Sequence, residues 1–137
     1  MKYDDANRGK IQYRDRARQI VDFSDIRYKN ITPTDIDGFF EKGNKAFVFY
    51  EYKLSGVDIP KGQKLALTRL VDVLSSAGKA AVLFICRHEV STPDEDIDAA
   101  NSIVEKIYWN NRWHRGIGKT VKEHTDKFMQ WVNTLKM

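Results

Sequence analysis

The chain has 137 residues, of which 42% are hydrophobic, so it has one domain's length and enough apolar mass for one buried core. That composition excludes a mainly disordered protein, and no apolar run approaches the ~18 residues of a membrane span. Lysine and arginine number 23 and aspartate and glutamate 19, a mild excess of +4 that is compatible with an anionic partner. The single cysteine, Cys86, excludes an internal disulfide framework and a multi-cysteine zinc site.

The charge of the chain is unevenly distributed. Basic side chains gather in residues 8–18 and 106–137, whereas residues 89–105 hold six acids and neither lysine nor arginine. Such segments are typical of solvated helix faces and also of surfaces that bind nucleic acid, so both interpretations stay open. Prolines and glycines are scattered singly, which predicts a single domain over residues 1–137. The first residues lack the apolar run of a secretion signal, so we expect an intracellular, cytoplasmic protein.

The first half of the chain predicts a helix and a β-hairpin. Apolar residues recur at helical spacing in residues 11–22. Residues 36–41 are a short strand candidate, and the glycine and asparagine of residues 42–45 can adopt the positive φ of a turn. Residues 46–54, AFVFYEYKL, are rich in phenylalanine, valine and tyrosine and form the clearest strand. We therefore expect a hairpin over residues 35–54.

A second helix and a buried strand follow. Residues 63–77 carry an apolar stripe, and Gly78 stands where a C′ glycine belongs. The stripe consists of Leu67, Leu70, Val71 and Leu74. Residues 80–86 are a continuous apolar run, typical of a strand covered on both faces. Residues 91–95 combine a hydroxyl cap, a proline and acids, which predicts a helix start.

The C-terminal part predicts a hairpin and a last helix. Residues 102–109 have no clear periodicity, and the Asn110-Asn111 turn favours a hairpin that returns through residues 112–113. Residues 121–135 show an amphipathic helical pattern. The order αββ(β)αβ, followed by the hairpin and the helix, predicts an α/β or α+β fold with a central sheet flanked by helices.

The clearest strand carries two charges that a buried strand should not carry. Alternation places Phe47, Phe49, Glu51 and Lys53 on one face of it. Burying either charge without a partner is costly. An ordinary ion pair at a strand end is one explanation, and a functional site is the other.

The preceding strand offers carboxylates that favour a site. Asp35 and Asp37 alternate along it and so share a face, and a turn centred on residues 43–44 brings Asp37 opposite Glu51. Two carboxylates on adjacent strands repel each other unless a cation lies between them. Mg²⁺ prefers such oxygen ligands, and Lys53 beside them could polarise a bound water or a phosphate. The pattern predicts a phosphodiester hydrolase.

These motifs follow one another in a definite order. Thr34-Asp35-Ile36-Asp37-Gly38 precedes Glu51-Tyr52-Lys53, and Gly62-Gln63 opens the next predicted helix. This order resembles the PD-(D/E)xK nuclease superfamily over residues 11–88. The chain is similar in size and layout to archaeal Holliday-junction resolvases and small phage-type nucleases. The resemblance implies a restriction-endonuclease-like core with a mixed sheet, and the cytoplasm of a bacterium or phage-infected host as the setting.

The resemblance assigns a role to each matching position. Asp37 and Glu51 match the metal-binding carboxylates, with Asp35 as the fallback for Asp37. Tyr52, between the glutamate and the lysine, would offer its backbone carbonyl to the metal. Lys53 matches the lysine that positions or deprotonates the attacking water.

Two positions depart from the pattern of the superfamily. Gln63 lies near the catalytic glutamine that some relatives place beside the site, but Leu67 stands where those relatives carry a tyrosine. Resolvases carry a glutamate in the first helix, whereas residues 6–34 contain none. Asp22 or Asp25 would have to take its place, or that ligand is absent.

The resemblance implies a Mg²⁺-dependent (or Mn²⁺-dependent) deoxyribonuclease whose partner is DNA and not a membrane. A chain of this length leaves little room for a separate sequence-reading domain, so a structure-specific endonuclease of DNA recombination is expected. Four basic residues would contact the DNA backbone: Arg14, Arg18, Lys61 and Lys64. A homodimer stays open, and a non-catalytic nucleic-acid-binding protein on the same fold is the alternative.

Other residues carry weaker signals. His88, at a predicted strand end, could reach the site, and His124 is expected to be a partly exposed helix residue. Cys86, in an apolar run, is expected to be buried and inert. An aromatic and basic cluster suits nucleic acid, although its tryptophans are also typical of core or dimer contacts. It consists of Trp109, Arg112, Trp113, His114 and Arg115.

Overall fold

The structure is a computed structural model that describes Gly9 and residues 19–136. Its contacts divide the chain into two compact units, residues 1–33 and residues 34–137, and each unit is described by itself. In the first unit the helix expected over residues 11–22 does not include residues 19–22, and residues 11–18 lie outside the described residues. Ile20 and Val21 are largely exposed, and a short helix needs a packed apolar face to persist.

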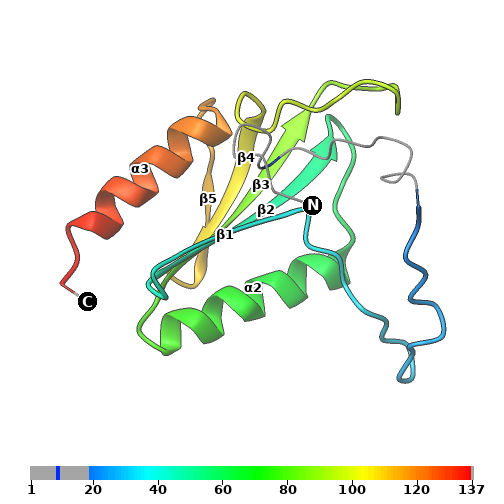
Figure 1. Cartoon of the computed structure of the whole chain (residues 1–137), viewed down its shortest axis with the longest axis horizontal. Coiled ribbons are helices and arrows are strands. Elements are labelled where there is room, and N and C mark those ends of the chain that lie inside the picture. The colour runs from blue at the N-terminus through cyan, green and yellow to red at the C-terminus, as the bar shows by residue number, and fades with distance from the viewer. Residues whose placement is uncertain (1–8, 10–18, 137) are drawn as a thin grey trace, which may run out of the picture. The chain divides into compact units, whose positions relative to one another are not determined.

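The second unit is built on a five-stranded mixed sheet with the strand order β1-β2-β3-β4-β5. The strands are β1 (Gly38–Lys42), β2 (Ala46–Leu54), β3 (Ala80–His88), β4 (Ile103–Trp109) and β5 (Arg112–Arg115). β2 and β3 run parallel, and all other neighbours are antiparallel. Two helices, α2 (Lys61–Ser76) and α3 (Val121–Asn133), lie on opposite faces of the sheet (Figure 1). The expected α+β class is confirmed, and no helix of the described residues is long and apolar enough to cross a membrane.

The β1–β2 hairpin follows the predicted turn but is shorter than predicted. Gly43 and Asn44 have φ values of 60° and 58° in the turn, and β2 coincides with the predicted strand. β1, however, begins at Gly38, so Asp35 and Asp37 precede the strand and do not alternate along it. The reason is local. The Asp37 N–H donates to the Glu51 side chain, and the Asp37 side chain accepts from the Tyr52 N–H, so these hydrogen bonds take the place of backbone pairing between strands.

Alternating side chains of β2 and β3 fill two cores, one beneath each helix. The core under α2 consists of Phe49, Leu67, Val71, Ala81, Leu83, Ile85 and Tyr108. The core under α3 consists of Ala46, Val48, Ala80, Val82, Phe84, Cys86, Val104, Val121, Phe128 and Val132. β3 is therefore covered on both faces, as its apolar run predicts.

Both helices agree with the predicted patterns, within two residues at each end. Gly78 has a φ of 83° directly after the C-cap Ala77 of α2. α3 starts with a capping box, in which Thr120 and Glu123 satisfy each other's backbone N–H groups.

The helix start predicted for residues 91–95 is wrong. Residues 91–100 form turns and bends, and every one of them is exposed. The cap and the acids are local signals, but this segment has no apolar stripe that could pack against the sheet. At its end, the side chains of Asn101 and Ser102 donate hydrogen bonds to Asp98 instead.

A bulge in β4 sets the position of Glu105. Ile85 pairs with Lys106 while Cys86 pairs with Val104, so Glu105 is the extra residue. The N–H of Gly116 donates to the carbonyl of Glu105 at 3.1 Å. A Cβ at Gly116 would lie 1.7 Å from the carbonyl oxygen of Val104, so only glycine allows this approach. The predicted C-terminal hairpin, β4–β5, is confirmed.

Candidate functional site

The candidate site lies at the carboxyl end of β2, beside the start of β1. Gly38 pairs with Tyr50, so the same register brings Asp37 opposite Glu51. The N–H of Asp37 donates to Glu51 Oε1 at 3.3 Å, and the N–H of Tyr52 donates to Asp37 Oδ2 at 2.8 Å. The expected proximity of Asp37 and Glu51 is confirmed. Their position is also typical, because open sheets bind ligands outside the carboxyl ends of their parallel strands.

Glu51 is a buried carboxyl at the centre of this arrangement, with 2% of its surface exposed. Gln63 Nε2 donates to Glu51 Oε2 at 2.6 Å, so the first turn of α2 orients the carboxyl. Burial raises the pKa of Glu51 to about 7, and the nearby carboxylates of Asp37 and Asp35 also raise it. A carboxyl that is desolvated and crowded by like charge is more common in functional sites than elsewhere.

Lys53 extends from the same face of β2 and is 9% exposed. Its Nζ forms an ion pair with Glu105 Oε2 at 3.0 Å. Within the described residues Lys53 thus pairs with Glu105 and not with Glu51. An ion pair between Glu51 and Lys53 therefore does not explain why this strand carries two buried charges. The ammonium is thus held by an ion pair on the face of β2 that also carries Glu51.

Sequence reasoning missed Glu105. It is the last acid of the segment 89–105 and stands next to Lys106, in a stretch whose periodicity is unclear. The bulge that places Glu105 beside Lys53 has no sequence signal of its own. The nearest clue is Gly116, a glycine that packs closely against β4 next to the bulge.

The oxygen ligands at the site fit a small divalent cation. Asp37 and Glu51 supply two carboxylates, and the Tyr52 carbonyl is a further oxygen between them and Lys53. The Tyr52 hydroxyl donates to the Ala99 carbonyl at 3.1 Å, away from the carboxylates, so its backbone is the part available to the site. Mg²⁺ often uses one or two carboxylates with substrate phosphate, and a cation would relieve the repulsion that raises the pKa of Glu51. Among the described residues no cluster of three or more His, Cys, Asp or Glu side chains could hold a metal, so the fit is to a two-carboxylate site.

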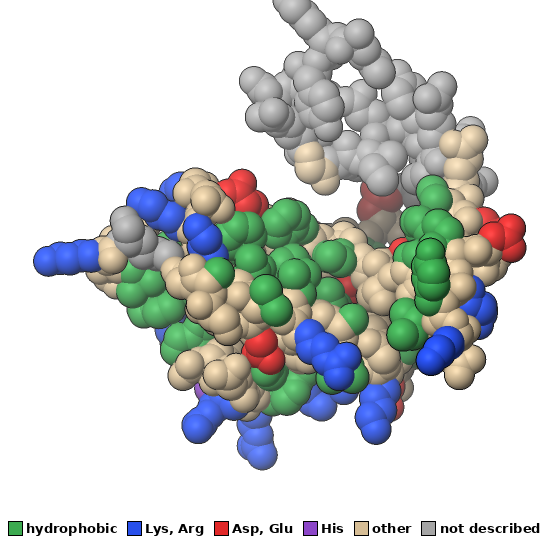
Figure 2. All heavy atoms as spheres, turned by 90° about the horizontal axis from the view of Figure 1, so that it is seen from below, with side chains coloured by type: hydrophobic (Ala, Val, Ile, Leu, Met, Phe, Trp, Pro, Cys, Tyr) green, Lys and Arg blue, Asp and Glu red, His purple; other side chains and the backbone are tan. Residues whose placement is uncertain are grey.

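The first turn of α2 is basic. It contains Lys61, Gln63 and Lys64, has no acidic residue, and has no side-chain cap at Pro60. Unpaired N–H groups at a helix start attract anions, and the lysines add to that attraction. Figure 2 views the second unit from the α2 side, where lysine and arginine side chains project around the rim.

The sequence also predicts roles for Asp35, Asp22, Arg14 and Arg18. Asp35 is exposed ahead of β1 and acts on Glu51 through its charge. Arg14 and Arg18 lie outside the described residues. Asp22, in the first unit, accepts a hydrogen bond from the Ser24 N–H at 2.9 Å, which lowers its pKa.

The histidines and the cysteine have structural environments. His88 Nδ1 accepts a hydrogen bond from the Val90 N–H at 3.1 Å. The expectation that His124 is partly exposed is wrong, because its ring is buried and its Nε2 donates to the Gly116 carbonyl at 2.6 Å. Cys86 is fully buried, as expected, and burial raises the pKa of its thiol to about 12, which disfavours the reactive thiolate.

The aromatic and basic cluster expected in the C-terminal hairpin is divided between the two faces of the sheet. Trp109 lies on the α3 side, where its ring meets Trp131 edge-on at 5.4 Å. Trp113 lies on the α2 side, with its ring 5.1 Å from that of Tyr108. Of the two tryptophans, Trp113 therefore shares a face with Glu51 and Lys53.

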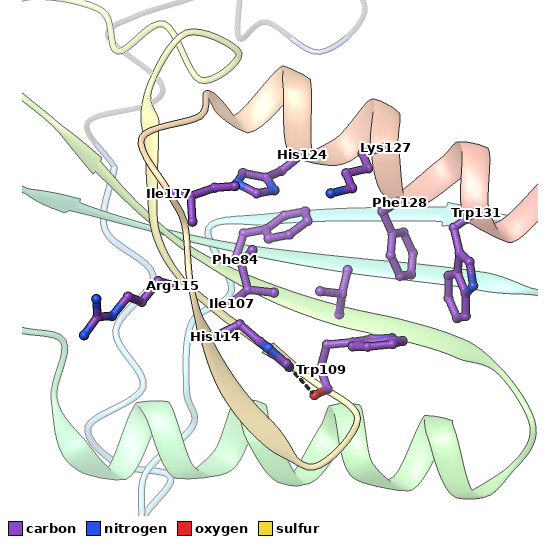
Figure 3. Close-up of a pocket in the computed structure, with 11 residues that line it drawn as sticks. Phe84, Ile107, Trp109, His114, Arg115, Ile117, His124, Lys127, Phe128 and Trp131 are labelled. Carbon is purple, nitrogen blue, oxygen red and sulfur yellow. Dashed lines mark hydrogen bonds between the residues drawn. The ribbon is translucent and has the colours of Figure 1, made fainter.

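A separate pocket of about 310 Å³ lies between α3 and the sheet (Figure 3). Its aromatic lining includes Phe84, Trp109, Phe128 and Trp131. The carboxylates of Asp37 and Glu51 are not part of this lining, since they belong to the face covered by α2. The pocket is thus distinct from the candidate site.

Comparison with known proteins gives no match: no protein family, no curated protein and no solved structure shows significant similarity to the chain. The candidate site is therefore defined by its geometry alone.

Proposed function

We propose that the chain is a metal-dependent DNA endonuclease of the PD-(D/E)xK type, with a restriction-endonuclease-like core. The observation that carries the proposal is the contact of Asp37 with the buried Glu51, which Gln63 orients, with Lys53 held two residues further on the same face. Two carboxylates and an ammonium at one sheet end are suited to the hydrolysis of a phosphodiester bond.

Each side chain has a role in the proposed reaction. Asp37, Glu51 and the Tyr52 carbonyl would hold Mg²⁺ or Mn²⁺, which when bound neutralises phosphate charge and lowers the pKa of a water. Gln63 fixes the orientation of Glu51. Lys53 donates hydrogen bonds to the attacking water or to a phosphate oxygen, where it offsets the negative charge that develops.

The proposed substrate is a DNA structure and not a base sequence. The second unit consists of the sheet, two helices and their connections, and the candidate site lies at the carboxyl end of β2. The basic first turn of α2, with Lys61 and Lys64, would contact phosphates, which position a strand without reading its bases. These features favour a structure-specific, resolvase-like enzyme.

A cleavage assay tests the proposal. Four substrates, a four-way junction, a flap, a single strand and a plain duplex, are incubated with Mg²⁺ or Mn²⁺. Wild type should cut at least one of them, whereas Glu51→Ala and Lys53→Ala should cut none and still bind DNA. Lys42→Ala, at the opposite and exposed end of the hairpin, is the matched control and should cut normally.

Two outcomes would contradict the proposal. Normal cleavage by both Glu51→Ala and Lys53→Ala would place the reaction elsewhere. Tight, salt-sensitive binding by wild type without cleavage of any substrate would favour the alternative, a non-catalytic nucleic-acid-binding protein on the same fold.

A further inference from the structure

Trp113 is a large aromatic side chain that remains 39% exposed on the face of the sheet that carries the candidate site. It pairs with Tyr108 across β4 and β5, and Tyr108 belongs to the core under α2. The Tyr108 hydroxyl donates to Asp72 of α2 at 2.9 Å, so the ring that supports Trp113 is fixed from two sides. The tryptophan is thus supported by Tyr108 and only partly exposed.

The first turn of α2 connects Trp113 with Glu51. Gln63 donates to Glu51 at 2.6 Å, and the next residue, Lys64, has its Nζ 5.8 Å from the centre of the Trp113 ring. Adjacent residues of one helical turn therefore contact both the carboxyl and the tryptophan.

The distance between the two follows from the sheet. Glu51 is on β2 and Trp113 on β5, three strands away, and neighbouring strands are ~4.8 Å apart. Three strand spacings give about 14 Å across the sheet. Glu51 shares its row with Arg115, two residues beyond Trp113, and this offset of ~7 Å along the strands brings the separation to about 16 Å. A nucleic-acid strand rises by ~3.4 Å per nucleotide in a duplex and can extend further when single-stranded, so a few nucleotides cover this separation.

Two cations share the row of Glu51 across the sheet. Glu51 pairs with Ile85, Ile85 with Lys106, and Lys106 with Arg115, so these residues form one row across the sheet. Lys106 and Arg115 are both exposed, and like charges directly opposite each other destabilise a strand pair unless an anion offsets them. Arg115 also lines the pocket between α3 and the sheet, and in Figure 3 its guanidinium points away from the aromatic rings of that pocket.

We infer that Trp113 is a stacking platform for an unpaired nucleobase. Lys64, Lys106 and Arg115 would hold the phosphates of the same strand. A base inside a closed duplex has no free π-face, whereas a base in a single strand or flap can stack on an exposed indole. This inference rests on the proposed function and narrows its substrate to DNA with a single-stranded segment next to the bond that is cut.

Binding measured without cleavage tests the inference separately from the proposed activity. Fluorescein-labelled oligonucleotides, one single-stranded and one a closed hairpin duplex, are titrated with the full chain in EDTA and followed by anisotropy. Trp113→Ala should weaken single-strand binding roughly 5- to 100-fold and change duplex binding by less than about twofold. Trp113→Phe should retain most of the affinity, because a phenyl ring still stacks.

Trp131→Ala is the matched control, since Trp131 is 38% exposed but lies on the α3 side, and it should leave single-strand binding unchanged. Undiminished single-strand binding by Trp113→Ala would overturn the inference. Equal losses on the single strand and the duplex, or no binding of the single strand by wild type, would also overturn it. A selective loss in a protein that cuts no substrate would support the platform while refuting the nuclease.

Discussion

Replacing Glu51 by glutamine should stabilise the metal-free protein at alkaline pH and abolish its activity. Burial and the neighbouring carboxylates raise the pKa of Glu51 from 4.5 to about 7. A carboxyl whose pKa is raised by folding favours the folded state only while it is protonated. Its contribution is therefore complete below about pH 4.5 and is lost as the pH rises through about 7. The interval between the two pKa values corresponds to ~3 kcal/mol in the free energy of unfolding.

Glutamine has the shape of glutamate and does not ionise. Its carbonyl oxygen can accept the hydrogen bond from Gln63. Its amide nitrogen then replaces Oε1, so the Asp37 N–H loses its acceptor, which costs about 1 kcal/mol. We expect Glu51→Gln to raise the free energy of unfolding by about 2 kcal/mol at pH 8. At pH 5 the ionisation penalty is only ~1 kcal/mol and the lost hydrogen bond offsets it, so the free energy of unfolding should be nearly unchanged.

Urea unfolding in EDTA, followed by circular dichroism at both pH values, measures this difference. Mg²⁺ at pH 8 should stabilise wild type and not Glu51→Gln, because only the ionised carboxylate binds the cation. Glu41→Gln, an exposed glutamate of the same hairpin, is the control and should show no gain that depends on pH. Equal free energies of unfolding for wild type and Glu51→Gln at pH 8 would refute the claim that burial penalises this carboxylate.

Three further predictions follow from the same geometry. Lys53→Met should reduce the kcat of the proposed nuclease at least 100-fold. Glu105→Gln should also reduce kcat, with little change in KM, because the substitution releases the Lys53 ammonium from its ion pair. An unchanged kcat in Glu105→Gln would show that Glu105 is not part of the site. Gly116→Ala should destabilise the fold by about 3 kcal/mol or more in urea unfolding, since its Cβ would meet the Val104 carbonyl at 1.7 Å, whereas Gly62→Ala, with nothing within 4 Å, should be neutral or stabilising. Mg²⁺ affinity measured by calorimetry should fall by up to about tenfold per pH unit below pH 7, as Glu51 gains its proton, and equal affinities at pH 6 and pH 8 would contradict this assignment.

The sequence predicts most of the sheet and the carboxyl pair, because both depend on short-range patterns. The β-forming run of β2 and the glycine and asparagine of its turn define the hairpin, and the hairpin register alone brings Asp37 to Glu51. The apolar stripe of α2 and the continuous apolar run of β3 then predict a helix over a buried strand. Each of these features depends on residues close together in the chain.

The errors arise where a local signal had no tertiary support, or where support came from far along the chain. The caps around residues 91–95 predict a helix, but no apolar face there packs against the sheet. His124 is buried because the Gly116 carbonyl accepts its hydrogen bond, a contact that helical periodicity does not reveal. Glu105 reaches Lys53 through a bulge, and no propensity scale encodes one inserted residue.

Glu105, the ion-pair partner of Lys53, comes from a distant part of the chain, and this affects the order in which the site can assemble. Asp37, Glu51, Lys53 and Gln63 come from one continuous stretch, whose contacts close short loops, whereas Glu105 belongs to β4, beyond α2 and β3 in the chain. Contacts between residues distant in the chain form late, since their loops are entropically costly to close. The carboxyl pair can therefore exist before its ammonium is secured, and a local opening of β4 and β5 would release Lys53 while leaving Asp37 and Glu51 together.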